Sequence, residues 1–171
     1  MKLGPACGAL AVLAAFAACG TPPPEWGPDG GTCIAYASDP GFDLTAPMMS
    51  FKANVMPVLT ASCSSASCHG IANGAQGGLF LGAELAQGTD AAKVFTSLVG
   101  PMAGELGTMP YVTASDPDHS FVMHKLDGDQ CMLAARCTNQ TCNDTMPRDG
   151  QLPVETRDIL RRWIAQGAQN N

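Results

Sequence analysis

Hydrophobic side chains recur at helical spacing in four parts of the chain. The first stripe occupies positions i, i+4, i+7 and i+8 and consists of Phe51, Val55, Val58 and Leu59. This spacing predicts a short amphipathic helix that runs into Cys63. Alternation of apolar and polar residues with a period of two, which is typical of strands, is scarce. The pattern therefore favours an all-α fold.

A second helix and a terminal helix are predicted by the same spacing together with signals at their ends. Asp90 is suited to cap the second helix, which ends before Gly100-Pro101. Its apolar stripe is Ala91, Val94, Phe95 and Leu98. The terminal helix is expected over 153–166 and stops at Gly167. Its apolar stripe is Ile159, Leu160, Trp163 and Ile164.

The third predicted helix has two possible starts. Ser115 and Asp118 fit a capping box, whereas Asp116 before Pro117 fits a simple cap with proline at the first helical position. In either case the helix ends before Gly128. Its apolar residues are Phe121, Val122, Met123 and Leu126.

The amino-acid composition predicts long loops between these helices. Gly (19) and Pro (13) make up about a fifth of the 171 residues, which disfavours long helices and coiled coils. Five of the glycines lie within 74–88, a stretch expected to be a loop wrapped over another part of the molecule. The length suits one small domain with little room for a second.

The balance of acidic and basic residues limits the classes of molecule that we expect the protein to bind. The chain carries 9 Lys and Arg against 15 Asp and Glu, a formal net charge of −6, and Arg161-Arg162 is its one basic cluster. A nucleic-acid partner would require a concentrated basic surface. We therefore expect no nucleic-acid binding, and the acidic surface suits a basic protein partner.

The N-terminus has the layout of an export signal. Lys2 precedes an uncharged apolar run over 6–19, which is shorter than the about 20 residues that a membrane-spanning helix needs. The run ends in Ala17-Ala18-Cys19-Gly20, which resembles the lipobox of bacterial lipoproteins. Phe16 stands where Leu is usual, so ordinary cleavage near 15–17 is the alternative.

These features divide the chain into three parts. Residues 1–18 are predicted to be a signal peptide, 19–47 a lipidated N-terminus on Cys19 followed by a flexible, Pro- and Gly-rich tether, and 48–171 the folded domain. The mature protein is expected to be exported to the cell envelope of a bacterium and anchored to a membrane, at the periplasmic face or the outer membrane. Disulfides persist in that oxidising compartment.

The segment 63–70 carries the strongest chemical signal. Two thiols, Cys63 and Cys68, precede His69 directly, which is the arrangement for attaching haem covalently while the adjacent imidazole reaches the iron. Two residues usually separate the cysteines, and here there are four; spacers of four occur among multihaem cytochromes. The alternative is a Cys63-Cys68 disulfide beside an incidental histidine.

Several further segments, in this order and spacing, resemble the cytochrome c family and in particular exported bacterial cytochrome c-like domains. The resemblance runs from about Phe51 to Ala168. Besides the haem motif it consists of 51–59, 77–81, 97–100, 116–121, Lys125-Leu126, Met146-Pro147 and 159–168. It implies a small helical cytochrome c-like domain with one haem c.

The same resemblance implies a set of iron ligands. Cys63 and Cys68 would hold the haem, with His69 as the proximal ligand and Met146 as the distal one. A Met thioether as second ligand raises the potential of a haem c. Met109-Pro110 repeats the Met-Pro pair and is the second choice. His119 and His124, on or near the third helix, are expected to be solvated, although either would make a bis-His haem of lower potential.

Four cysteines remain, and an even number in an exported chain suits two disulfides. They are Cys33, Cys131, Cys137 and Cys142, for which three pairings are possible. A metal site built from the last three with His69 is the alternative, but zinc sites usually use tighter cysteine pairs. A disulfide here would also clasp the loop that precedes Met146.

Three functions follow from these observations. The leading one is electron transfer by a covalently bound haem c in a membrane-tethered, exported protein, with redox proteins as partners and no small-molecule substrate. The alternative is a haem-less structural or binding module of the cell envelope with Cys63 and Cys68 as a disulfide. An enzyme such as a peroxidase requires an open iron position and a distal acid-base residue, so we expect no enzymatic activity.

Overall fold

The computed structural model describes residues 33–71, 73, 75–82 and 91–171. The predicted signal peptide, the lipidated Cys19 and the Asp90 cap lie outside the described residues. None of the helices within the described ranges is long and apolar enough to cross a membrane.

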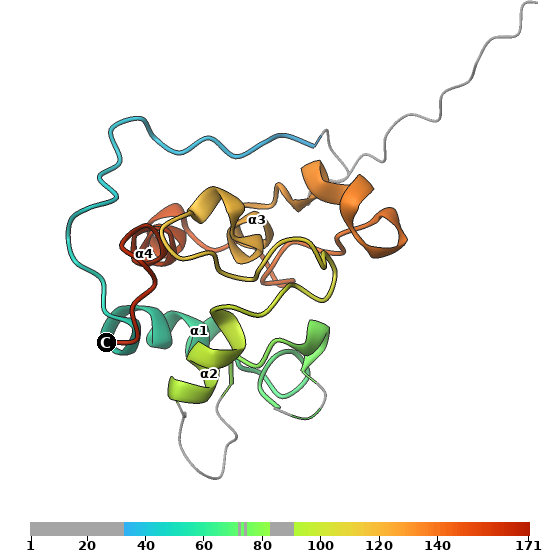
Figure 1. Ribbon diagram of the computed structural model, residues 1–171, viewed down its shortest axis with the longest axis horizontal. Coiled ribbons are helices and arrows are strands. Elements are labelled where there is room, and N and C mark those ends of the chain that lie inside the picture. The colour runs from blue at the N-terminus through green and yellow to red at the C-terminus, as the bar shows by residue number, and fades with distance from the viewer. Residues whose placement is uncertain (1–32, 72, 74, 83–90) are drawn as a thin grey trace, which may run out of the picture.

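The described chain is helical and contains no strand, so the predicted all-α class is confirmed (Figure 1). A π-helical turn, η1 (Phe51–Val55), leads directly into α1 (Met56–Ser62). The other α-helices are α2 (Ala91–Leu98), α3 (Phe121–Asp127) and α4 (Val154–Ala165). All four predicted helices are present, separated by long connections (Figure 1).

An aromatic cluster joins three of these elements. The ring of Phe51 from η1 lies 5.3 Å from Phe95 of α2 and 5.2 Å from Trp163 of α4, measured between centroids. Phe51 and Trp163 are fully buried. Such aromatic pairs are worth about 0.5–1.5 kcal/mol beyond the burial of their area. This cluster fixes the direction in which α1 runs toward the 63–70 segment.

The third predicted helix is divided in two. Asp116 accepts a hydrogen bond from the His119 N–H and caps a 3₁₀ turn, η3 (Pro117–His119). Ser120 then adopts an extended conformation, and α3 begins only at Phe121. The simple Asp116 cap is therefore the observed one. The capping box is wrong, because Ser115 has a left-handed φ of 67° and its N–H donates to Ile164 of α4.

Short 3₁₀ turns fill part of the expected loops. They are η2 (Gln76–Gly78), η4 (Gln130–Arg136) and η5 (Thr138–Gln140). The hydrophobic pattern predicted none of them: η2 and η5 have three residues each, too few to show an apolar period, and the seven residues of η4 carry no apolar stripe at helical spacing. η2 belongs to the glycine-rich 74–88 stretch, of which 75–82 is described.

Two disulfides form from the four cysteines expected to make them. Cys33 pairs with Cys131, and Cys137 pairs with Cys142. The first bond ties the N-terminal segment to η4, and the second closes a short loop before Met146. The alternative metal site is wrong, because its three cysteines are all in disulfides and no cluster of metal-binding side chains occurs among the described residues.

Residues 33–47, expected to belong to the tether, lie along α4. Tyr36 covers two guanidinium groups, with ring-to-guanidinium distances of 5.0 Å for Arg157 and 4.4 Å for Arg161. Both arginines pair with the buried carboxylate of Asp127. Phe42 covers Arg162 at 4.2 Å in the same way. Cation–π contacts and the Cys33 disulfide thus hold this segment against the domain.

Candidate functional site

A cavity of about 250 Å³ opens between α1, α3 and the segments that follow each of them. Its walls are mainly apolar, as is usual for a cofactor pocket. The apolar lining side chains are Val58, Leu59, Ala61, Leu79, Leu81, Phe121, Val122, Leu126, Pro147, Leu152 and Leu160. Six of them come from the stripes of α1, α3 and α4, so the helices that build the core also build this wall.

The four residues predicted to bind haem all line this one cavity. Cys63, Cys68 and His69 reach it from the end of α1, and Met146 reaches it from the loop between η5 and α4. The segment that holds Cys63, Cys68 and His69 is far from Met146 in the sequence. The fold therefore brings the predicted proximal and distal ligands to the same space.

The four-residue spacer forms an exposed turn. The carbonyl oxygen of Ser65 accepts hydrogen bonds from the N–H groups of Cys68 and Gly70, at 3.0 and 2.9 Å. Ser65, Ala66 and Ser67 are exposed, whereas Cys68 and His69 are half-buried. The longer spacer is thus accommodated by a largely exposed turn, and both cysteines line the cavity together with Ser65.

Two glycines allow the backbone after His69 to pack closely. A Cβ atom on Gly70 would lie 2.1 Å from the Ser64 carbonyl oxygen, and one on Gly82 would lie 2.1 Å from the Gly70 Cα atom. No side chain fits at either position. The close approach accompanies a hydrogen bond from the Leu81 N–H to the His69 carbonyl oxygen at 2.8 Å, which fixes the His69 backbone.

The His69 ring is oriented by a backbone carbonyl. Its Nδ1 atom lies 2.9 Å from the carbonyl oxygen of Leu79. Because a carbonyl oxygen only accepts, Nδ1 carries the proton, and the neutral ring then has a free electron pair on Nε2. Nε2 has no hydrogen-bond partner among the described residues. A backbone acceptor of this kind is the usual partner of a metal-binding histidine.

Cys63 and Cys68 are both free thiols, so the structure does not form the alternative Cys63-Cys68 disulfide. Burial raises the pKa of the Cys63 thiol to about 11, and the charge of Cys68 adds to this shift. Thiols that act as redox nucleophiles have a lowered pKa instead. The environment of Cys63 is therefore unlike that of a thiol-disulfide oxidoreductase.

The two candidate methionines lie in different places. Met146 is half-buried, lines the cavity and donates its N–H to the Lys125 carbonyl oxygen at 2.8 Å. Met109 is 4% exposed, belongs to the hydrophobic core and does not line the cavity. Of the methionines within the described ranges, Met146 alone presents its side chain to the cavity.

The other two histidines lie outside the cavity lining. His119 is exposed and its Nδ1 contacts the Asp116 carboxylate at 2.8 Å, which agrees with a solvated side chain. His124 is less exposed than expected. Its Nδ1 contacts Asp129 at 2.8 Å and its Nε2 contacts the Asp118 carbonyl oxygen at 3.1 Å, so both nitrogens are engaged.

Sequence reasoning missed the polar part of the cavity wall. Charged groups of both signs line it, namely Glu105, Lys125, Arg148 and Asp149, together with Gln76 and Tyr111. One feature of the sequence did point to a polar group in this wall: Lys125 is a charged residue among the apolar residues of the third helix. Glu105 lies in a loop without periodicity, and no sequence pattern marks it.

Comparisons of this chain with protein-family models, with curated proteins and with solved structures find no match. The donor set of the site suits a haem c: two free thiols, an imidazole with Nδ1 engaged and Nε2 free, and a thioether all line one largely apolar cavity.

Proposed function

We propose that this protein is an electron carrier of the cytochrome c type, with one haem c attached to Cys63 and Cys68. The observation that carries this proposal is the convergence of these two thiols, His69 and Met146 on a single cavity. The small cytochrome c-like helical fold is part of the same proposal.

Each residue would have a distinct role. The Cys63 and Cys68 thiols, at the end of α1 and in the turn that follows it, would each add to a vinyl group of the haem. His69 would offer Nε2 to the iron while Leu79 holds Nδ1. Met146 would supply the thioether as the second ligand, and the apolar wall would exclude water. The haem itself supplies a one-electron couple between ferric and ferrous iron.

Electron transfer rather than enzymatic turnover suits this donor set. With His69 and Met146 both engaged, the iron keeps no open position for a substrate. A redox protein is then the expected partner, and the formal net charge of −6 favours a basic one.

Spectroscopy of the pyridine haemochrome tests the proposal. The protein is produced in cells that express the haem-attachment machinery, then denatured in alkaline pyridine and analysed by intact mass. We expect one covalent haem in the wild type and in the spacer control Ser67→Ala, and none in Cys63→Ala/Cys68→Ala. A wild type without haem, with Cys63 joined to Cys68 in non-reducing mass mapping, would instead indicate the haem-less envelope module.

The membrane anchor is proposed on the Cys19 motif and has its own test. Cys19→Ser should move the protein from the membrane fraction to the soluble periplasmic fraction, because two or more acyl chains are needed for stable anchoring. Membrane association that persists in Cys19→Ser would remove the lipid anchor from this proposal and leave the haem site unaffected.

A further inference from the structure

Lys125 places a buried ammonium group at the wall of the cavity. Its side chain is 7% exposed, and its neighbours on α3 that line the cavity, Phe121, Val122 and Leu126, are apolar. A lysine in such surroundings is costly unless its charge is paired and hydrogen-bonded. The contacts of Lys125 show what compensates for this cost.

Both ends of Lys125 hold the segment 142–146. Its Nζ donates to the Cys142 carbonyl oxygen at 2.6 Å, and its own carbonyl oxygen accepts from the Met146 N–H at 2.8 Å. Hydrogen bonds from a charged donor are stronger than those between neutral groups. One residue of α3 therefore fixes the start and the end of the loop that presents Met146.

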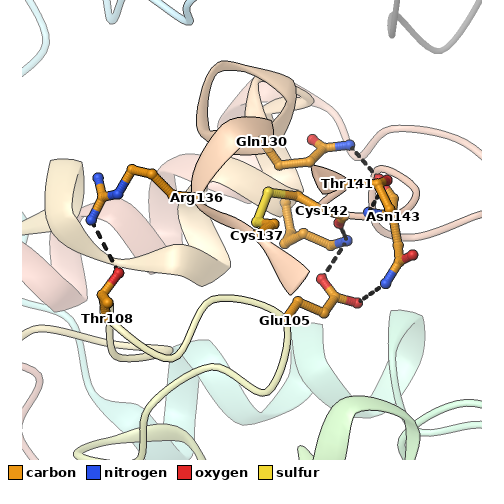
Figure 2. Close-up of a disulfide and its surroundings, with 9 residues drawn as sticks. Glu105, Thr108, Gln130, Arg136, Cys137, Thr141, Cys142 and Asn143 are labelled. Carbon is orange, nitrogen blue, oxygen red and sulfur yellow. Dashed lines mark hydrogen bonds and ion pairs between the residues drawn. A yellow bond between two sulfur atoms is a disulfide. The ribbon is translucent and has the colours of Figure 1, made fainter. Parts of the chain in front are cut away.

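Glu105 completes the pairing from the opposite side of the loop. One of its oxygens lies 3.1 Å from Lys125 Nζ, and the other accepts from Asn143 Nδ2 at 2.7 Å. In Figure 2, Glu105 accepts a hydrogen bond from Asn143, the residue that follows Cys142 of the Cys137–Cys142 disulfide. Gln130 Nε2 adds a further hydrogen bond to the Asn143 carbonyl oxygen at 3.2 Å. The loop is thus held by side chains on two sides.

We propose that Lys125 is a positioning residue that holds the Met146 thioether at the cavity, and that the Lys125–Glu105 pair sets the charge felt by the iron. This inference rests on the haem function proposed above. It assigns a role in that function to Lys125 and Glu105, which contact no substrate and lie outside the motif at 63–70.

Removal of the charge of Lys125 and removal of the charge of Glu105 should shift the redox potential in opposite directions. Both side chains line the cavity, where charges interact more strongly than in water. A cation near the iron favours the ferrous form, because reduction removes one positive charge from the metal. Loss of Lys125 should therefore lower the potential, and loss of the Glu105 charge should raise it.

The experiment measures the redox potential and the near-infrared sulfur-to-iron band of the purified haem protein. Lys125→Met keeps the apolar stem and removes the ammonium, with the exposed Lys52→Met as a control of equal charge change. We expect Lys125→Met to weaken or lose the band and to lower the potential. Glu105→Gln should retain the band and raise the potential, whereas the exposed Glu155→Gln control should leave both unchanged.

Each of the remaining outcomes either supports or overturns the proposal. If Lys125→Met does not fold, Glu105→Gln alone decides: an upward shift of the potential relative to the Glu155→Gln control supports the proposal. Potentials and bands that match the Lys52 and Glu155 controls overturn it while the haem function stands. A wild type that carries no haem overturns both, and intact mass distinguishes that case from the previous one.

Discussion

At the scale of single residues, the site depends on atoms of the main chain as much as on the ligands themselves. The Leu79 carbonyl oxygen selects the tautomer of His69, and the Lys125 carbonyl oxygen holds the amide of Met146. Neither acceptor is a side chain. Substitutions that move the backbone should therefore affect the site as strongly as substitutions of the ligands.

The distal ligand is the sharpest test at this scale. Met146→Ala should abolish the near-infrared band of the ferric protein, lower the potential and open the iron to small ligands, because the thioether is lost while Cys63 and Cys68 still hold the haem. Met109→Ala is the matched control: it should leave the band in place, since Met109 is buried in the core. The reverse behaviour of the two variants would assign the ligand to Met109.

Gly70 provides a second prediction. Gly70→Ala should lower the free energy of unfolding by about 1–3 kcal/mol or more, because the new methyl group would meet the Ser64 carbonyl oxygen at 2.1 Å and backbone atoms cannot swing aside. Gly107→Ala is the control, since no atom lies within 4 Å of the Cβ position there. Urea unfolding of both variants gives the comparison, and equal stability of the two would contradict the close packing.

At the scale of elements, α3 connects the cavity to the rest of the molecule. Phe121, Val122, Lys125 and Leu126 line the cavity, while His124 and Asp127 make polar contacts outside its wall. Asp127 pairs with Arg157 and Arg161 of α4, and His124 pairs with Asp129 just before η4. One short helix thus links the cavity wall to two other elements.

The His124 contact predicts a dependence of stability on pH. Burial lowers the pKa of His124, but the Asp129 carboxylate, the Asp118 carbonyl oxygen and the charge of Asp127 outweigh it, so the net pKa is raised. A raised pKa stabilises the fold below the ordinary value of about 6.5, and this stabilisation is lost as the pH rises through the folded-state value.

The measurement compares the free energy of unfolding at pH 5.5 and pH 8.5, values chosen on either side of about 6.5. Between these two values, the wild type should lose more stability than His124→Gln does. His119→Gln, at a side chain 73% exposed, should behave like the wild type. An identical pH profile for the wild type and His124→Gln would show that the Asp129 contact does not stabilise the protonated ring.

The helices were predictable from the sequence and the smaller turns were not, for a physical reason. Apolar stripes such as Phe51, Val55 and Leu59 repeat every helical turn because one face is buried, and each predicted stripe lies on an observed helix. A 3₁₀ turn such as Pro117–His119 is too short to show a period. Its start was nevertheless marked by Asp116 before Pro117.

The candidate site, too, was predictable from the sequence only in part. The motif around Cys63 and His69 is local and therefore visible, whereas Glu105 reaches the cavity only through the tertiary fold. The pairing of Cys33 with Cys131 is likewise a property of the whole chain, because the number of cysteines limits how many disulfides can form and does not say which cysteines pair.

At the scale of the whole molecule, the two disulfides close loops of very different length. The sequence separation is 98 residues for Cys33–Cys131 and 5 for Cys137–Cys142. In the chain-entropy account, a longer loop removes more freedom from the unfolded chain. The two bonds should therefore contribute unequally to stability.

We expect Cys33→Ala/Cys131→Ala to cost about 4–5 kcal/mol and Cys137→Ala/Cys142→Ala about 2 kcal/mol of unfolding free energy. Denaturant titration of the oxidised proteins measures both. The short-loop variant should instead change the near-infrared band more, because its disulfide precedes Met146. Equal losses of stability would mean that contacts in the native state, rather than the freedom of the unfolded chain, set the effect.

The Cys33–Cys131 bond also determines how mechanical force enters the molecule. If the chain before Cys33 is a membrane tether, a pull on it passes covalently through Cys33 into Cys131 and η4. The contacts of Tyr36 and Phe42 with α4 then lie outside the load path. Drag on the domain would not peel residues 33–47 away while the bond is intact, and after reduction these contacts would be the first to bear the load.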